Sequence, residues 1–267
     1  MSARTDRFRE LHRTGCFVIP NPWDVGSARL LVKLGFPALA TTSSGFAWSI
    51  GLRDHQSSLE QTLDHLRTIS RSVDEPVNAD FEGGFAVEPD GVAANVTAAV
   101  KTGIAGISIE DSTEDATNPL FEFELSVKRV RAAREAIEKS GTGVLLTGRS
   151  EGFIAGRPHL GETIRRLTAY SDAGADCLYA PGLKNIDDIR AVVKAVAPKP
   201  VNVLAGSDFT TVAALAGAGV RRISVGGALA RTAWTGFIAA AKEIAESGTF
   251  SGLGRAIGGS EMDSRFD

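Results

Sequence analysis

The sequence contains few cysteines, and their placement excludes two kinds of site. Its two cysteines, Cys16 and Cys177, stand far apart, each within its own apolar stretch. Neither belongs to a CxxC pair or to a Cys/His spacing, so the chain lacks the pattern of a zinc site or of a disulfide framework. We expect two buried, reduced thiols instead.

An excess of positive charge and long hydrophobic stretches are also missing. Lysine and arginine number 29 against 32 aspartate and glutamate residues, a net charge of −3, whereas nucleic-acid binders usually carry a basic stripe. No apolar run approaches the roughly 18–20 residues that cross a membrane. Residues 1–15 are charged and lack the apolar segment of a signal peptide. We therefore expect a cytoplasmic protein without nucleic-acid or membrane partners.

Short apolar runs alternate with segments of helical period along the whole chain. Eight runs read as strands: 16–21, 37–43, 76–81, 106–111, 143–149, 176–181, 200–206 and 221–227. Most are continuously apolar, which is typical of parallel strands that are buried on both faces. Eight helices are expected between and after them: 25–35, 58–73, 90–103, 124–141, 161–175, 185–197, 208–219 and 228–248.

Eight strand–helix units in 267 residues predict an α/β fold of the (β/α)8 TIM-barrel type. A doubly wound sheet is the alternative, and the absence of GxGxxG after any strand disfavours it. No linker divides the chain, so residues 1–267 are interpreted as one barrel domain. A glycine-rich C-terminal tail follows from about residue 247, and it is either frayed or docked on a neighbour.

Polar residues follow the predicted strands, and in a barrel these strand ends meet on one face. They are Asn21, Trp23 and Asp24; Thr41, Thr42, Ser43, Ser44 and Gly45; Asp54; Asn78, Asp80 and Glu82; Glu110 and Asp111; Arg149 and Glu151; Tyr179; Asn202; and Ser224. Clustered carboxylates repel each other unless they share a cation or a proton. Oxygen ligands without a convergent His or Cys favour Mg²⁺ or Mn²⁺.

The strand ends also offer groups that bind an anion. Arg149 supplies a planar fork that suits a substrate carboxylate. The Thr/Ser/Gly run after the second strand offers hydroxyl and N–H donors for a second anionic oxygen. Trp23 and Asn202 are further candidates for substrate contact, although Trp23 more often serves as wall packing. Together these groups predict a site for a small 2-oxo acid or its enolate.

Other interpretations were weighed against the same residues. A single acid at a strand end is usually a cap or solvated, but Asp80, Glu110 and Arg149 together favour a functional site. Glu82 and Asp111 are left undecided. The four histidines lie in helices or loops and are expected to be non-catalytic, and His55 beside Asp54 is the least secure of them.

Two other barrel chemistries are weaker. A Schiff-base aldolase needs a lysine on a strand, whereas the lysines here fall in helices and loops. A phosphate site would use backbone amides after the last two strands, and the stretches "LAGSDF" and "SVGGALAR" are compatible with one.

Six stretches in this order resemble the isocitrate lyase / phosphoenolpyruvate mutase superfamily, in particular its small, mutase-like branch. They are "PNPWDVGSARLLVKLGF", "SIGLRD", "NADFEGGF", "GISIEDS", "LLTGRSEGFIAG" and "ETIRRLTAYSDAGAD", and the resemblance spans about residues 15–245. It implies a barrel whose last helix is swapped with a neighbour in homodimers or tetramers. It also implies Mg²⁺, a 2-oxo acid or its enolate, and the making or breaking of C–C or P–C bonds.

The resemblance assigns roles by position. Asp80 matches a direct metal ligand, Glu110 a ligand acting partly through water, and Asp54 an acid near the metal. Arg149 matches the arginine that binds the substrate carboxylate. The stretch 41–43 (Thr41, Thr42 and Ser43) matches the loop that holds a carboxylate or enolate oxygen, and residues 112–120 match a mobile gating loop.

Three departures from the family pattern narrow the function. Asn78 stands where an aspartate is frequent, and we count it as a supporting metal ligand. The gating segment has no cysteine, which disfavours isocitrate and methylisocitrate cleavage. It matches the mutases at Asn118, a candidate substrate contact, but it carries Ala116 where they have a lysine.

These observations predict a Mg²⁺-dependent lyase that cleaves or decarboxylates a small 2-oxo or 2-hydroxy acid through an enolate held on the metal. The general acid or base is open, with Glu114 and Glu151 as candidates. Mutase-type P–C chemistry is the alternative, and a non-catalytic barrel that binds a 2-oxo acid is the second alternative.

Overall fold

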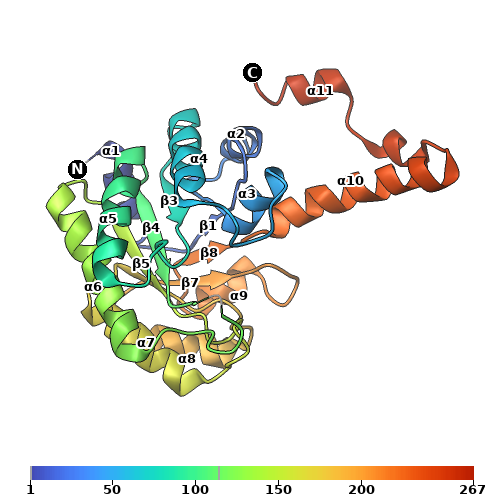
Figure 1. Ribbon diagram of the computed structural model, residues 1–267. Coiled ribbons are helices and arrows are strands. Elements are labelled where there is room, and N and C mark those ends of the chain that lie inside the picture. The colour runs from blue at the N-terminus through green and yellow to red at the C-terminus, as the bar shows by residue number, and fades with distance from the viewer. Residues whose placement is uncertain (1, 114) are drawn as a thin grey trace.

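The computed structural model describes residues 2–113 and 115–267, and its centre is a barrel of parallel strands (Figure 1). The strands pair in the order β1-β8-β7-β6-β5-β4-β3-β2, and every pair is parallel. Their bounds are β1 Phe17–Ile19, β2 Leu39–Ala40, β3 Val77–Asp80, β4 Gly106–Glu110, β5 Leu145–Arg149, β6 Cys177–Tyr179, β7 Val201–Leu204 and β8 Arg222–Ser224. The amide of Ala40 donates to the carbonyl of Pro20 at 3.0 Å, which joins the β1 and β2 edges. The predicted (β/α)8 fold is therefore confirmed.

Most of the helices lie around the barrel, and those after the last strand extend away from it (Figure 1). They are α1 Ala3–Leu11, α2 Val25–Lys33, α3 Ser43–Ser49, α4 Leu59–Ser72, α5 Pro89–Ala99, η1 Val100–Thr102, α6 Phe123–Ser140, α7 Leu160–Asp172, α8 Ile186–Val196, α9 Val212–Gly217, α10 Ala228–Ser247, η2 Ser251–Arg255 and α11 Gly259–Asp263. Local capping sets several of the starts: Ser58, for example, forms a capping box with Gln61 at the start of α4.

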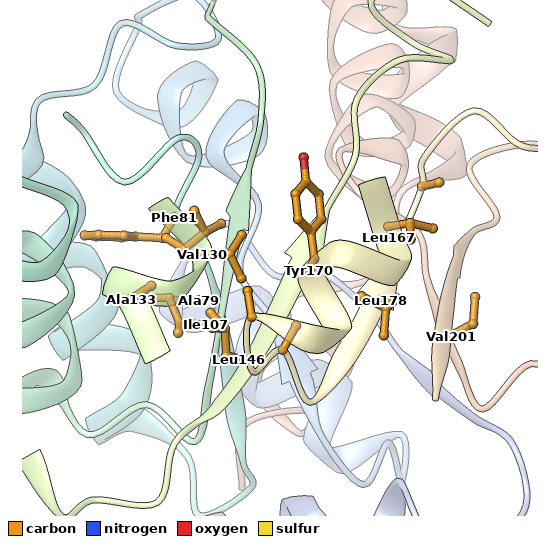
Figure 2. Packing of buried hydrophobic residues seen from close by; sticks show 14 of the residues in the cluster. Ala79, Phe81, Ile107, Val130, Ala133, Leu146, Leu167, Tyr170, Leu178 and Val201 are labelled. Atoms are coloured by element: carbon orange, nitrogen blue, oxygen red, sulfur yellow. The ribbon is translucent and has the colours of Figure 1, made fainter. Parts of the chain in front are cut away.

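Strand alternation decides which side chains enter the barrel. Successive strand side chains point to opposite faces, so Ala79 packs outward while its neighbours Asn78 and Asp80 face the barrel interior. Ala79, Ile107 and Leu146 meet Val130 of α6 in the core between the strands and the helices (Figure 2). Apolar burial on the outside thus fixes the strands that carry polar groups on the inside.

Three α-helices, α1, α3 and α11, were not predicted, and one helix was predicted too long. The N-terminal α1 begins at a Ser2 capping box, and its Phe8 is fully buried against Gly106 of β4. The predicted strand 37–43 ends at Ala40, because the hydroxyl of Thr42 accepts from the amide of Gly45 and caps α3. The helix predicted over 208–219 spans only Val212–Gly217, since Thr211 caps it.

Helix α10 extends away from the barrel and ends at the Gly248 C-cap (Figure 1). It carries exposed apolar side chains, including Phe237 at 64% and Ile238 at 48% exposure. The following residues are ordered as η2 and α11, and Lys33 of α2 donates to the carbonyl of Ser264 at 2.8 Å. The predicted exchange of this helix with a neighbour stays a prediction. Over the described residues, every helix is too short or too polar to cross a membrane.

Candidate active site

A cavity of about 270 Å³ opens at the carboxyl ends of the strands. Nine residues predicted for the site line it: Thr41, Thr42, Ser43, Asp54, Asn78, Asp80, Arg149, Glu151 and Asn202. They come from four strands, β2, β3, β5 and β7, and from the loops that follow them. The barrel geometry therefore brings most of the predicted groups into one space.

Arg149 at the end of β5 is the centre of this cavity. One terminal nitrogen, Nη1, lies 3.1 Å from Oδ1 of Asp80 and 3.0 Å from Oε2 of Glu110. The Nε and Nη2 atoms donate to the carboxylate of Glu151, with Nη2 at 3.3 Å. Asp80 also accepts from the amide of Ser43 at 3.0 Å and from its hydroxyl at 3.1 Å. One guanidinium thus joins carboxylates from β3, from β4 and from the loop after β5.

Burial makes this network electrostatically costly. The side chains of Glu110 and Glu151 are only 2% and 5% exposed. Burial raises the pKa of Glu110 well above its usual value, even though Arg149 opposes the shift, and raises that of Glu151 in the same way. Burial lowers the pKa of Arg149, but the surrounding carboxylates outweigh it, so that pKa stays above its usual value. Three acids that share one guanidinium therefore favour the uptake of a proton or of a further cation.

The donor chemistry of the network fits a hard divalent cation, because all of its acidic ligands are oxygens. Within the described residues, however, no three His, Cys, Asp or Glu side chains converge as a ready-made metal site. Nη1 of Arg149 instead contacts both Asp80 and Glu110. The guanidinium and a cation would therefore compete for the same two carboxylates.

Two of the three asparagines predicted for the site, Asn78 and Asn202, are hydrogen-bonded to or lie beside Arg222 inside the barrel. Arg222 of β8 donates through Nε to Oδ1 of Asn202 at 2.9 Å and through Nη2 to the hydroxyl of Thr147 at 3.0 Å. Its Nη1 lies 3.5 Å from Oδ1 of Asn78, whose amide nitrogen donates to the carbonyl of Ala79. Asn202 also donates to Ser224 at 2.9 Å. Both amides are thus engaged within the barrel, and their predicted roles toward metal and substrate stay predictions.

Asp111, which the sequence left undecided, lies behind the cavity. Its Oδ1 accepts from the amide of Glu151 at 2.7 Å. Its Oδ2 accepts from the Tyr170 hydroxyl at 2.6 Å and from Arg166 at 3.1 Å. Asp111 is 2% exposed, and its hydrogen bond fixes the backbone position of Glu151 in the loop after β5.

Three predicted site residues are not brought to the cavity lining. Trp23 is half-buried and packs near Gly45. Asn118 is exposed, and its amide donates to the carbonyl of Asp115. Glu110 is buried beneath the lining and reaches the site through Arg149. Glu114 lies outside the described residues.

Four polar or charged lining residues were not predicted as part of the site: His55, Ser108, Arg222 and Arg231. Ser108 and Arg222 lie on strands, two positions before the strand-end residues Glu110 and Ser224, so the period of two could have found them. Arg231 lies in the first turn of α10, after the Gly226–Gly227 pair. His55 follows Asp54, which was the available signal.

Comparison with known proteins follows this geometry. A family profile described as phosphoenolpyruvate phosphomutase matches residues 8–245. The chain belongs to the phosphoenolpyruvate mutase family. It is 32% identical to an uncharacterized protein of Mycobacterium tuberculosis (82% of this chain and 81% of that protein). It is 29% identical to an oxaloacetate decarboxylase of Bradyrhizobium diazoefficiens (72% of this chain and 68% of that enzyme).

A solved structure resembles this family member closely. The Burkholderia cenocepacia J2315 protein, provisionally described as a lyase/mutase, has a TM-score of 0.95 and 44% identity, over 98% of this chain and 96% of that one. The predicted resemblance to the isocitrate lyase / phosphoenolpyruvate mutase superfamily is confirmed. The chain is an enzyme of this superfamily, and its relatives include lyases that cleave C–C bonds.

Proposed function

We propose that this family member is a divalent-cation-dependent lyase that cleaves or decarboxylates a small 2-oxo or 2-hydroxy acid. The observation that carries the proposal is the Arg149 network, in which one guanidinium serves three buried carboxylates. The surplus acid favours a cation, and the guanidinium favours an anionic substrate. The kinship to an oxaloacetate decarboxylase supports the substrate class.

Asp80 and Glu110 are the residues proposed to hold Mg²⁺ or Mn²⁺, with Asn78 in support. When bound, the cation would supply Lewis-acid stabilisation for negative charge that develops on the substrate's 2-oxygen. Asp54 lines the same cavity and is half-exposed, so it adds negative charge at the mouth. The cation would replace the positive charge that Arg149 now gives to Asp80 and Glu110.

Arg149 is proposed to bind the substrate carboxylate through its planar fork. Turning toward the substrate releases Asp80 and Glu110, whereas Glu151, held by Asp111, keeps the guanidinium in the cavity. Thr41, Thr42 and Ser43 line the same cavity, and the amide and hydroxyl of Ser43 donate to Asp80. Substrate and cation are therefore expected to bind cooperatively, because each frees the partner groups of the other.

The assembly proposed for the enzyme is a homodimer or homotetramer in which α10 is exchanged. This helix is 20 residues long, its first turn lies at the barrel, and Ala230 is its one buried residue. Its large apolar side chains Phe237 and Ile238 are exposed to solvent in the single chain. A second copy of the chain would cover them.

The proposal is tested by a thermal melt with Mg²⁺ alone and then with Mg²⁺ plus oxalate, an enolate mimic. A ligand at 100 times its dissociation constant should add about 2.7 kcal/mol to the free energy of unfolding. A rise that requires both components supports one shared site, and Asp80→Ala should abolish it while the exposed Asp187→Ala should not. Failure of Mg²⁺ plus oxalate to stabilise the folded wild-type protein would contradict the proposal.

A substrate screen then separates the remaining chemistries. Release of CO₂ or of a carbon fragment from oxaloacetate and substituted malates is the expected result. Turnover of phosphonopyruvate instead would favour the P–C alternative. Tight binding of oxalate without turnover of any of these acids would favour a barrel that binds 2-oxo acids without catalysis.

A further inference from the structure

Two residues with unusual backbone conformations meet at the edge of the cavity. His55, in the loop between α3 and α4, has φ +62°, and Glu82, in the loop after β3, has φ +49°. Non-glycine residues rarely adopt positive φ, and such strained conformations cost of order 1–3 kcal/mol each and tend to occur at functional sites. Here the two residues with positive φ belong to different loops, and their side chains contact each other.

The contact holds the imidazole in a defined orientation. Nδ1 of His55 lies 3.4 Å from Oε2 of Glu82, a side chain that is 5% exposed. On the other side of the ring, Nε2 lies 3.9 Å from Oδ2 of Asp54. His55 is 36% exposed and lines the cavity together with Asp80 and Arg149. The ring is thus fixed from the protein side and open to solvent at the mouth.

The acidic surroundings keep this ring protonated. The hydrogen bond with Glu82 raises the pKa of His55 to about 10; burial opposes the shift, and the charges of Asp54 and Glu110 add to it. Among the described lining residues His55 is the one imidazole. The competing proton donors are less suited, since Glu151 is bound to Arg149 and burial raises the pKa of Tyr179 to about 12.

We propose that His55, oriented by Glu82, is the general acid of the reaction, an inference that rests on the proposed lyase function. Cleavage breaks the bond between C3 of the 2-oxo acid and the departing carbon, and its electron pair becomes the C2–C3 double bond of an enolate. The Nε2–H bond of His55 then breaks, its proton bonds to C3, and the carbonyl at C2 re-forms. Neutral His55 regains its proton from water at the open mouth.

The test measures proton transfer separately from bond cleavage. Pyruvate is the C3-protonated form of the expected enolate, so its C3 protons exchange with solvent through the reverse of the proposed step. We would follow this exchange for deuterium by NMR in D₂O that contains Mg²⁺. Positioned general acids and bases contribute about 10²–10⁴-fold. His55→Asn should therefore lower the exchange rate at least ~100-fold. Mg²⁺ plus oxalate should still raise the melting temperature of this variant as they do for the wild type.

The choice of variants keeps the backbone intact. Asparagine and glycine both tolerate positive φ, so His55→Asn and His55→Gly avoid new strain at this position. Added imidazole should restore exchange to His55→Gly but not to an Asp80→Ala variant. The matched control is His159→Asn at the N-cap of α7, where asparagine preserves capping; its exchange rate should equal that of the wild type.

Glu82→Gln tests the orienting role. Losing the carboxylate lowers the pKa of His55. Because His55 must be neutral to take up a C3 proton of pyruvate, the pH at which exchange rises should move to lower pH. A pyruvate exchange rate in His55→Asn equal to that of the wild type would overturn the proposal. So would a wild-type enzyme that binds Mg²⁺ and oxalate but exchanges no pyruvate protons. A wild-type enzyme that binds neither would instead remove the proposed function itself.

Discussion

Replacing Arg149 by methionine should uncover the charge imbalance of the active site. The change keeps an unbranched side chain but leaves Asp80, Glu110 and Glu151 without their shared cation. At an effective dielectric of about 20, one charge pair at 3 Å is worth roughly 5–6 kcal/mol before desolvation is subtracted. Removing one partner of a buried ion pair typically costs about 3–5 kcal/mol, and we expect this range for the free energy of unfolding at pH 8.

The loss should depend on pH with a definite sign. The folded-state pKa values of Glu110 and Glu151 are raised above their ordinary values. Such groups favour the folded state below their unfolded pKa and lose that contribution as pH rises through the folded pKa. Removing Arg149 raises both pKa values further. The deficit of the variant should therefore shrink at pH 5.5 and grow toward pH 8.

Urea denaturation at several pH values, with and without Mg²⁺, provides the assay. Mg²⁺ should stabilise Arg149→Met more than the wild type, because no guanidinium then competes for Asp80 and Glu110. Arg190→Met is the control, since its ion pair with Asp187 is exposed and should contribute at most about 1 kcal/mol. Equal stabilities of the variant and the wild type across this pH range would refute the assignment of Arg149 as the counter-charge.

Three further predictions concern the framework around the site. Burial lowers the pKa of His65 to about 4, so the unfolded chain binds this proton at higher pH than the folded chain does. The free energy of unfolding should therefore fall as pH drops from about 6.5 to about 4, by at most ~1.4 kcal/mol per pH unit. His65→Phe should reduce this pH dependence in urea titrations. Phe237→Asp should shift the protein toward monomers in light scattering, whereas an unchanged mass would argue against exchange of α10. Phe8→Ala should lower the free energy of unfolding by about 3–5 kcal/mol, because removal of the fully buried ring leaves a cavity. A loss below about 1 kcal/mol would show that the packing of α1 against β4 contributes little to stability.

The sequence predicted the barrel because its signals are local and repeated. Apolar runs mark strands that are buried on both faces, and the helical periods between them fix the crossovers. The rule that strand ends share one face then placed Asp80, Arg149 and Glu151 in one cavity. The same local logic failed at Thr42, whose hydroxyl caps α3 where a longer strand was expected.

Only the tertiary structure decided how the groups in the cavity are paired. Nothing in the spacing of Asp80, Glu110 and Glu151 indicates that one guanidinium serves all three, since that depends on the register of β3, β4 and β5. The contact of His55 with Glu82 depends on two loops with positive φ. Packing imposes such conformations against local preference, so the chain's composition and periodicity determined the scaffold while long-range contacts determined the chemistry that it presents.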